Sequence, residues 1–565
     1  SIFWGIVLIL LQVQVNSSEG SLLPPIHLTC EYLNDPLGVQ ESNPRLAWYV
    51  QGDRRGSRQT AYQILVATSL DRLNQDSADV WDSGKVISEE SIQIPYAGKA
   101  MSSGQRVYWK VRTWDDRDAV TDYSQPAFWQ MGFLAREDWK AQWIGTPEEL
   151  PSPSPAPLLR HTLSLPSGVR QASVSVSALG LYELFINGQR VGENILAPEW
   201  TNYQKRIQYQ TYDVTRLLQS GENVVGAMLG EGWYAGTVGL LGKRQYGNRL
   251  ALIMQMDIEC QDGSRHQWMT GPEWKCSLNG PVRSTDIIVG EEYDGRKSMP
   301  GWNRPGFDDS HWDPVALIEN QVALVSQPNQ PIQITREIAA QSVKECSPGV
   351  FVFDLGQNMV GWSRCKVHGK PGDRIVLRHV EVLNPDGTIY TENLRGKFQI
   401  DTYILEGKEN EILEPHFTYH GFRYVEVDGL SYVPSTEDLQ GMVFHSHAPS
   451  VSRFECSDPM LNQLMKNIVW TLRGNLHSTP TDCPQRDERL GWMGDAQIFS
   501  QAAIFTLDMA AFFTKWTQDI RDAQASDGRF SDFSPNPSLK DGKFLGAPAW
   551  ADAGIIVPWR IYENY

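Results

Sequence analysis

The sequence predicts a multidomain protein in which several β-sandwich domains are followed by an α-helical domain. The chain has 565 residues, and at about 150 residues per domain this length suggests roughly three to five domains. Before residue 446, short segments alternate apolar and polar residues between Gly, Asp, Asn or Ser, which is typical of strands. From Ala448 onward, apolar residues recur at helical spacing instead.

The N-terminus carries an apolar run from Ile2 to Leu11. The run has the length of the hydrophobic segment of a signal peptide and is too short to span a bilayer. We therefore interpret residues 1–20 as the remnant of an export signal, with a buried strand or helix as the alternative. No other segment is apolar enough for a membrane helix. The sequence thus predicts an exported protein, periplasmic or extracellular, without a membrane span.

Bulk composition narrows the partners of the protein. The net charge is -17 and the pI is about 5.2, so most of the surface would repel nucleic acid. The 20 Trp residues suit stacking against sugar faces, although β-sandwich cores also use Trp. Nothing in the sequence indicates an oligomeric state.

The seven cysteines are scattered and show no CxxC spacing, so neither a zinc site nor a disulfide-rich scaffold is predicted. Cys260 and Cys276 could bridge neighbouring strands, but a reduced pair fits the spacing equally well. The odd number leaves at least one thiol free or in an intermolecular bond.

Three β-rich segments precede the helices. The first, residues 23–135, contains alternating runs such as Arg45–Val50 and Arg106–Arg112 and predicts an immunoglobulin- or fibronectin-like sandwich. The second, residues 137–328, includes the hairpin signal Asn187-Gly188, and a jelly roll is the simplest interpretation. The third, residues 331–446, is a further β-sandwich with strands such as those at 350–354, 374–378 and 423–427.

Residues 448–565 form the helical part. Apolar residues from Leu461 to Leu472 predict one helix, for which Ser457–Asp458 provide an N-cap and Pro459 suits the first turn. A second helical stretch is expected over about Asp495–Ala523, and a third near Gly554–Tyr565. A barrel of paired helices needs several times this length, so we expect the helical domain to be incomplete.

The densest polar cluster lies between the first two helical stretches, at Pro480–Asp495. It holds four carboxylates, two Arg and one Trp, a set that suits the proton transfers of glycoside hydrolysis. Pro484 places Asp482 on a loop. If the second half is helical, Glu488, Trp492 and Asp495 share one face. Asp482 and Asp495 would then raise the pKa of Glu488. A solvated, charged loop is the alternative interpretation.

The stretch Thr481–Asp495 resembles the signature of glycoside hydrolase family 78, the α-L-rhamnosidases, almost residue for residue. Asp354–Trp362, His420–Tyr424 and Trp550–Trp559 also resemble family segments. The resemblance implies several β-sandwich domains, the third of them concanavalin-like, followed by the first part of an (α/α)6 helical barrel. It further implies hydrolysis of terminal α-L-rhamnose from glycosides or polysaccharides, with inversion.

By motif position, the resemblance implies that Glu488 is the general acid. Residues that would line the rhamnose subsite are Asp482, Arg486, Trp492, Asp495, Trp550 and Asp552. An inverting enzyme also needs a carboxylate base, and no residue of this chain matches the family's base. We therefore expect the 565-residue polypeptide to be inactive or misfolded alone.

Two other functions remain open: a hydrolase for another deoxysugar or a uronic acid on the same fold, and a non-catalytic carbohydrate-binding surface protein. His379 with Glu381, and His416 with His420, could hold a metal, but structural roles are favoured. Glu193 and Glu199 could bind sugar or calcium, but a solvated loop is the preferred interpretation. No cofactor is expected, and nothing in the sequence supports a calcium site.

Overall fold

The computed structural model describes residues 22–53, 55–151, 153–396, 398–539 and 542–565. The expected export signal, residues 1–20, lies outside these ranges. The described chain divides into two compact units. The first consists of residues 22–36, 41–101 and 105–130, and the second of residues 37–40, 102–104 and 131–565. Among the described residues, no helix is both long and apolar enough to cross a membrane.

The first unit is a small β-sandwich, as the alternating pattern predicts. One sheet has the order β1 (Leu22–Cys30), β3 (Arg45–Gly52), β7 (Ile94–Pro95). The other contains β9 (Ala127–Met131), β8 (Arg106–Trp114), β4 (Ala61–Ala67) and β5 (Trp81–Asp82). The short strand β6 (Val86–Ile87) also pairs with β4, and the short helix α1 (Leu70–Asn74) follows β4 in the chain. Trp48 of β3 packs edge-on against Tyr62 of β4, with ring centroids 5.2 Å apart, so buried aromatic rings join the two sheets.

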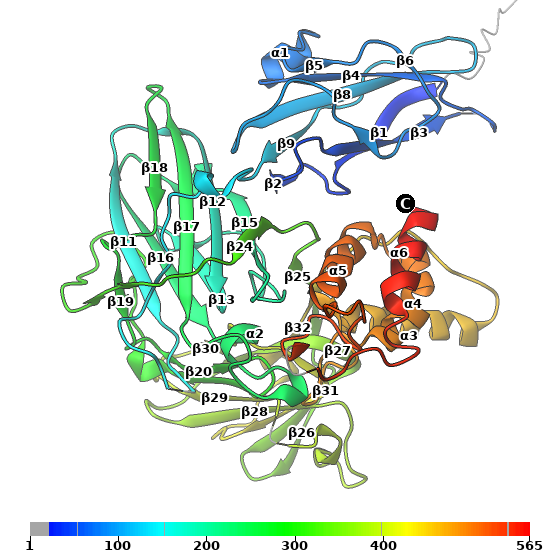
Figure 1. The fold of residues 1–565 in the computed structure, drawn as a ribbon. Helices are drawn as coiled ribbons and strands as arrows, with labels where there is room; N and C mark the ends of the chain where they lie inside the picture. The colour runs from blue at the N-terminus through cyan, green and yellow to red at the C-terminus, as the bar shows by residue number, and fades with distance from the viewer. Residues whose placement is uncertain (1–21, 54, 152, 397, 540–541) are drawn as a thin grey trace, which may run out of the picture. The chain divides into compact units, whose positions relative to one another are not determined.

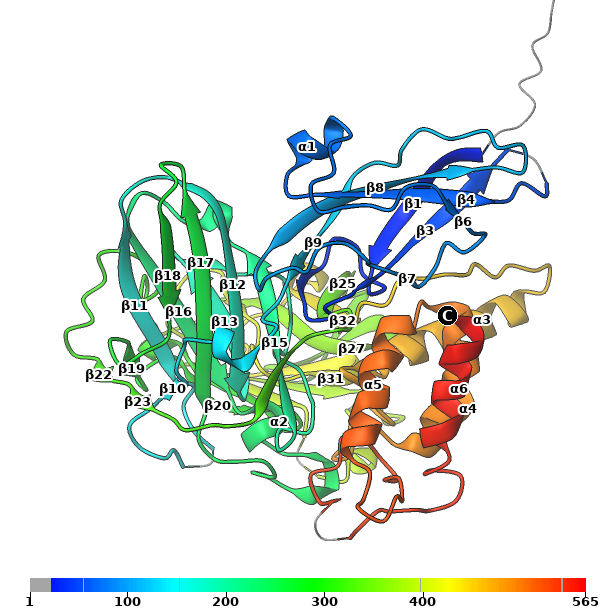
Figure 2. The same ribbon diagram turned by 45° about the horizontal axis from the view of Figure 1, so that its top comes forward.

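The second unit begins with two larger sheets that face one another (Figure 2). Their strands pair in antiparallel fashion except for the parallel pair β15–β24. The strands of the first are β10 (Ile144–Gly145), β12 (Val169–Leu179), β15 (Arg206–Asp213), β17 (Ala251–Cys260), β18 (Arg265–Met269), β23 (Ala316–Leu317) and β24 (Ala323–Ser326). Those of the second are β11 (Leu158–Leu165), β13 (Leu181–Ile186), β14 (Gln189–Arg190), β16 (Gly221–Gly230), β19 (Lys275–Ser277) and β22 (Asp313–Pro314). The predicted hairpin turn is confirmed: Ile186 pairs with Gln189, and Asn187 and Gly188 have φ values of 52° and 82°.

Short helical turns accompany these sheets. They are η1 (Arg136–Asp138), η2 (Thr215–Leu217), α2 (Gly232–Ala235), η3 (Gly239–Leu241) and η4 (Gly295–Lys297). All seven cysteines lie within the described residues, and all seven are free thiols. Cys260 and Cys276 belong to different sheets of this sandwich, so they do not lie on neighbouring strands of one sheet.

A third sheet of ten strands lies next to this sandwich. Its strands are β20 (Val282–Asp286), β21 (Gly290–Asp294), β25 (Ile332–Ala339), β26 (Ser342–Ser347), β27 (Val350–Val367), β28 (Arg374–Val380), β29 (Ile400–Ile404), β30 (Glu411–Leu413), β31 (His420–Asp428) and β32 (Leu439–Ser446), with η5 (Glu392–Leu394) and η6 (Thr436–Asp438) between them. The hairpin 282–294 precedes the third segment in sequence but extends this sheet, because β21 pairs in parallel with β29. That pairing satisfies backbone groups that would otherwise form an open edge.

The helices stand together beside the third sheet, in orange and red in Figure 1. They are α3 (Pro459–Gly474), α4 (Met493–Thr506), α5 (Ala510–Asp522) and α6 (Ala553–Asn564), with the short hairpin β33 (Leu476–His477) and β34 (Thr479–Pro480) between α3 and α4. The start of α3 is as predicted: the Asp458 carboxylate accepts a hydrogen bond of 2.8 Å from the amide of Met460.

The helical stretch expected over about Asp495–Ala523 consists of two helices in the structure, α4 and α5. The backbone becomes extended at Leu507 (φ -128°, ψ 155°), and this residue bridges to Ser450. Asp508 then accepts a hydrogen bond of 3.2 Å from the amide of Ala510 and starts a new helix. Periodicity alone does not reveal this break, because the pairing of Leu507 with Ser450 joins residues far apart in the chain.

Candidate active site

The loop Thr481–Trp492, which we name the motif loop, connects β34 to α4. Asp482 closes the loop on itself: its amide donates to the carbonyl of Leu490 at 3.0 Å, and its carboxylate accepts from the amide of Leu490 at 2.9 Å. The prediction that Pro484 keeps Asp482 on a loop is confirmed. The closed loop presents its charged side chains in a fixed arrangement.

Arg489 anchors the motif loop to the third sheet. Its side chain is buried, and Nη1 donates to the carbonyl oxygens of Ile287 at 2.9 Å and Tyr419 at 2.6 Å. The guanidinium also lies 4.7 Å from the centre of the Tyr419 ring. This arginine stabilises the backbone immediately after Glu488.

Glu488 lies at the centre of the charged groups. One carboxylate oxygen accepts a hydrogen bond of 3.0 Å from the indole N–H of Trp492. The other accepts from Arg395 at 2.8 Å and from Arg486 at 3.2 Å. Arg395 also pairs with Asp487 at 2.7 Å. The Glu488 side chain is 14% exposed, so the carboxylate is oriented by three donors and still reaches solvent.

The expected common helical face of Glu488, Trp492 and Asp495 is wrong. Helix α4 begins only at Met493, so Glu488 and Trp492 precede it and meet through the turn of the loop. Asp495 lies in the first turn of α4 with an exposed side chain, and the hydrogen bonds given for the Glu488 cluster do not include it. The closure by Asp482 and Leu490 delays the helix, an effect that no local sequence pattern reveals.

The expected rise in the pKa of Glu488 is also wrong for the free protein. Burial by itself would raise it, but hydrogen bonds from Arg395 and Arg486 outweigh burial and lower the pKa. The carboxyl with the raised pKa is Asp482. Burial, together with the negative charge of Glu488, raises the pKa of Asp482 to about 6. The proton of this pair therefore resides on Asp482 more readily than on Glu488.

Aromatic rings lie beside Trp492. Phe533 and Phe544 meet its ring edge-on, with centroids 5.4 and 5.9 Å away. Trp550 is 40% exposed and lies against Gly494, where an added Cβ would approach the indole to 3.0 Å. Phe533 is fully buried, so the two phenylalanines hold the Trp492 ring in place beside the charged cluster.

The later predicted residue Asp552 is less closely connected to the cluster. Its side chain is exposed and accepts a hydrogen bond of 3.1 Å from the amide of Ala549. The same turn is tied to α4, because the side-chain amide of Gln497 donates to the Ala549 carbonyl. The structure therefore places Trp550 and Asp552 near the start of α4, while Asp482, Arg486, Glu488 and Trp492 form the connected group.

Sequence reasoning missed Arg395 and Arg489. Arg395 follows η5 in the third sheet, 93 residues before Glu488, and its surroundings in the sequence show no motif. Arg489 lies inside the motif loop, and its position in the sequence does not distinguish it from a surface arginine. Its hydrogen bonds to the carbonyl oxygens of Ile287 and Tyr419 are visible only in the structure. Only the tertiary arrangement reveals either role.

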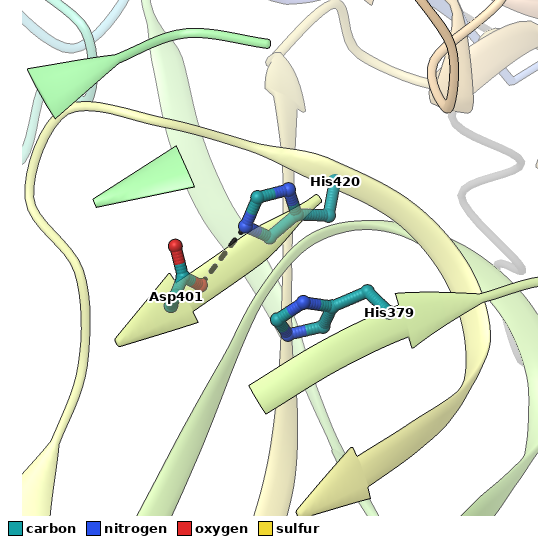
Figure 3. A group of neighbouring side chains, drawn as sticks. All are labelled: His379, Asp401 and His420. Carbon is teal, nitrogen blue, oxygen red and sulfur yellow. Dashed lines mark hydrogen bonds and ion pairs between the residues drawn. The ribbon is translucent and has the colours of Figure 1, made fainter. Parts of the chain in front are cut away.

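His379, Asp401 and His420 form a buried cluster within the third sheet (Figure 3). His420 Nε2 lies 2.9 Å from Asp401, and the two imidazole rings stack with centroids 4.3 Å apart. The nitrogens of His379 are both occupied, by the carbonyl of Gln399 at 3.0 Å and the hydroxyl of Ser363 at 2.8 Å. The carbonyl must accept and the hydroxyl then donates, so His379 has no lone pair left for a metal. The geometry supports the structural role that the sequence favoured.

The remaining candidates are separate from this cluster. His416 pairs with Glu183 at 3.1 Å and shares no partner with His420. Glu381 accepts a hydrogen bond of 2.9 Å from the side-chain amide of Asn358. Glu193 is exposed as expected, but the solvated loop expected for Glu199 is wrong, since its side chain is 2% exposed. Burial raises the pKa of Glu199, and the Lys515 ammonium together with several hydrogen bonds offsets only part of this rise.

Comparison with known families places each part of the chain. The matching families are described as the Rha78A-like N-terminal immunoglobulin domain (residues 25–135), the α-L-rhamnosidase N-terminal domain (167–336), the bacterial α-L-rhamnosidase concanavalin-like domain (344–445) and the bacterial α-L-rhamnosidase six-hairpin glycosidase domain (449–565). The helices α3–α6 are thus the start of a six-hairpin glycosidase domain.

Individual relatives extend this likeness over nearly the whole chain. An α-L-rhamnosidase of Streptomyces avermitilis is 36% identical, covering 95% of this chain and 68% of the relative. An α-L-rhamnosidase of Formosa agariphila is 37% identical, covering 95% of this chain and 59% of the relative. The crystal structure of the Streptomyces avermitilis α-L-rhamnosidase complexed with L-rhamnose superposes with a TM-score of 0.92 over 96% of this chain and 69% of that chain. The structure of the α-L-rhamnosidase from Dictyoglumus thermophilum superposes with a TM-score of 0.90 at 39% sequence identity, covering 95% of this chain and 61% of that chain.

The fold and the motif loop together define a glycoside hydrolase in which β-sandwich domains precede a six-hairpin glycosidase domain. The chain belongs to the α-L-rhamnosidases, glycoside hydrolase family 78. It spans between 58% and 68% of the length of the curated relatives that it matches.

Proposed function

We propose that the full-length protein hydrolyses terminal, non-reducing α-L-rhamnose residues from glycosides or polysaccharides, with inversion at the anomeric carbon. The observation that carries this proposal is the carboxyl pair Asp482 and Glu488, which a closed loop holds beside two arginines and an indole. Carboxyl groups held in this way suit proton transfer to a glycosidic oxygen. The relative of known structure that binds L-rhamnose supports the choice of sugar.

In this proposal Glu488 donates the proton to the leaving oxygen. Asp482 and Glu488 have oxygens within 4.8 Å of one another, whereas the acid and base of inverting glycosidases lie roughly 6.5–9.5 Å apart. Asp482 is therefore too close to be the water-activating base. We propose instead that Asp482, Arg486 and Trp492 hold the rhamnose ring through its hydroxyls and one face, with Asp495, Trp550 and Asp552 completing the subsite. We leave the base unassigned.

The direct test uses two aryl glycosides with the full-length protein. We expect turnover of 4-nitrophenyl α-L-rhamnopyranoside at least about 100-fold faster than of the α-L-fucopyranoside, since a site built to bind specific hydroxyls rejects a diastereomer that leaves them unpaired. Proton NMR during the first turnovers should show β-L-rhamnose as the initial product. Faster fucoside hydrolysis, or α-L-rhamnose as the first product, would overturn the substrate or the inversion, respectively. Sugar binding without turnover would favour a carbohydrate-binding protein.

We further propose that the protein is exported, to the periplasm or the extracellular space, and that the reaction needs no cofactor. The support for export is the apolar run near the N-terminus. Activity in the culture medium or the periplasmic fraction would support this location. Activity that survives dialysis against EDTA would support catalysis without calcium.

Arg395→Ala tests how the charge of Glu488 is controlled. Arg395 stabilises the ionised carboxylate at 2.8 Å, so its removal should raise the pKa of Glu488. Because the proposed acid acts only when protonated, activity should persist to higher pH. The alkaline limb of the kcat/KM profile should therefore move upward, as measured with the aryl rhamnoside from pH 4 to 9.

Arg453→Ala is the matched control. Arg453 is exposed and pairs only with Glu455 among the ion pairs described for it, at 3.0 Å, so its removal should leave the alkaline limb in place. A downward shift in Arg395→Ala would contradict the acid role of Glu488, as would a profile that coincides with that of the control.

A further inference from the structure

A cavity opens beside the motif loop, between β27 and α3. Its volume is ≈ 400 Å³, within the range of about 300–1,000 Å³ that is usual for ligand sites. Asp482 and Arg486 form part of its wall. The cavity therefore adjoins the Glu488 cluster through these two residues, although neither Glu488 nor Trp492 lines it.

A bulge in β27 builds one wall of this cavity. The pairing of β27 with β31 shifts register between Asp354 and Met359. Asp354 stabilises the bulge, because it binds Arg423 through two hydrogen bonds of 2.7 and 2.8 Å and accepts the amide of Gly356 at 2.6 Å. Gly356 has a φ of 71°, a backbone conformation that favours glycine. The strand thus presents Gln357 and Asn358 to the cavity instead of continuing the ladder.

The cavity wall is rich in side-chain amides. They come from three parts of the fold: Gln357 and Asn358 from the bulge, Asn467 and Asn475 from α3 and its C-cap, and Gln485 from the motif loop. Amides donate and accept hydrogen bonds at once, which matches the hydroxyls of a sugar. Trp470 adds an apolar ring.

The charges in the wall exclude other ligand classes. Two carboxylates, Glu381 and Asp482, face a single guanidinium, that of Arg486. An anionic ligand such as a uronic acid or a phosphate would meet more negative than positive charge. A neutral, hydroxyl-rich ligand fits this combination of amides, an indole and an excess of carboxylates over guanidinium groups.

We propose that this cavity binds the neutral sugar unit to which the terminal rhamnose is attached. The inference rests on the proposed function, because it places the leaving-group side of the glycosidic bond here. Arg486 connects the two regions: it lines the cavity, and its Nε donates to Glu488 at 3.2 Å. A disaccharide would span from the Trp492 side of Glu488 into the amide-lined cavity, so the protein would select for the sugar next to rhamnose.

The binding test uses full-length protein carrying Glu488→Gln, so that ligands are not consumed. Titration calorimetry compares 6-O-α-L-rhamnopyranosyl-D-glucose with L-rhamnose. Adding Gln357→Ala or Asn467→Ala, from opposite walls, should weaken disaccharide binding by about three- to tenfold, the value of one neutral hydrogen bond, and weaken L-rhamnose binding less. Gln440→Ala is the matched control, since Gln440 lies in the same sheet on β32 and outside the cavity lining.

The kinetic test separates failure of this inference from failure of the proposed function. In protein with Glu488 intact, Gln357→Ala should lower kcat/KM for the disaccharide about three- to tenfold relative to that for the aryl rhamnoside. If the parent hydrolyses both substrates and the variants show no selective loss, the cavity does not bind the second sugar. If L-rhamnose binding falls as much as disaccharide binding, the cavity holds the terminal sugar and the inference is overturned. If neither substrate is hydrolysed, the proposed hydrolase function is overturned. Calorimetry then still tests whether the cavity binds the second sugar.

Discussion

Glu488→Gln in the full-length protein is expected to lower kcat for rhamnosides by about 10²–10⁴-fold, the usual contribution of a positioned general acid. Glutamine has nearly the same shape and can still accept the Trp492 N–H, which now reaches the carboxylate at 3.0 Å. It cannot deliver a proton to the leaving oxygen. The matched control is Glu193→Gln, on an exposed loop that follows β14, which should retain parental kcat.

The leaving group distinguishes an acid from a structural residue. An aryl rhamnoside with an acidic phenol needs little protonation, so the loss in Glu488→Gln should shrink on 2,4-dinitrophenyl rhamnoside and stay large on alkyl rhamnoside. Asp482→Asn provides the comparison, because the pKa of Asp482 is the raised one, at about 6. If leaving-group dependence follows Asp482 and not Glu488, the acid has been assigned to the wrong carboxyl.

The sequence predicted the elements whose signals are local. Helix α3 begins where Asp458 and Pro459 place its N-cap and first turn. The Asn187-Gly188 turn closes its hairpin as expected. Both predictions succeed because neighbouring residues supply the stabilising contacts. The division between α4 and α5 was missed because the pairing of Leu507 with Ser450 connects residues far apart in the chain.

The candidate site divides in the same way. Composition marked the polar cluster, and the family resemblance singled out Asp482, Arg486, Glu488 and Trp492 within it. The structure brings these four together. The protonation state could not be predicted, because it depends on Arg395 from the third sheet. The nearby carboxylates predict a raised pKa of Glu488. Arg395, which is far from Glu488 in the sequence but hydrogen-bonded to it, helps to lower that pKa instead. Sequence reasoning therefore named the residues but not their charges.

Lys515→Met is expected to be the most destabilising substitution outside the candidate site. Lys515 of α5 and its partner Asp519 are both fully buried and 2.8 Å apart. The ammonium also donates to the carbonyl oxygens of Trp200 at 2.5 Å and Ser478 at 2.8 Å. Methionine preserves the volume but removes every donor. Breaking a buried ion pair from one side costs about 3–5 kcal/mol, since the remaining charge stays desolvated.

This network joins the helical domain to the sheet that contains β15. Arg206 of β15 binds Asp519, and its Nε pairs with Asp522 of α5 at 2.5 Å, so Asp519 retains one cation in the variant and the loss should not exceed the range for a buried pair. Ser478, which lies between β33 and β34, precedes the motif loop. We therefore expect a lower urea midpoint and also weaker substrate binding in Lys515→Met. Lys466→Met, on the exposed side of α3, should change neither, and equal midpoints for the two variants would show that the buried pair contributes no stability.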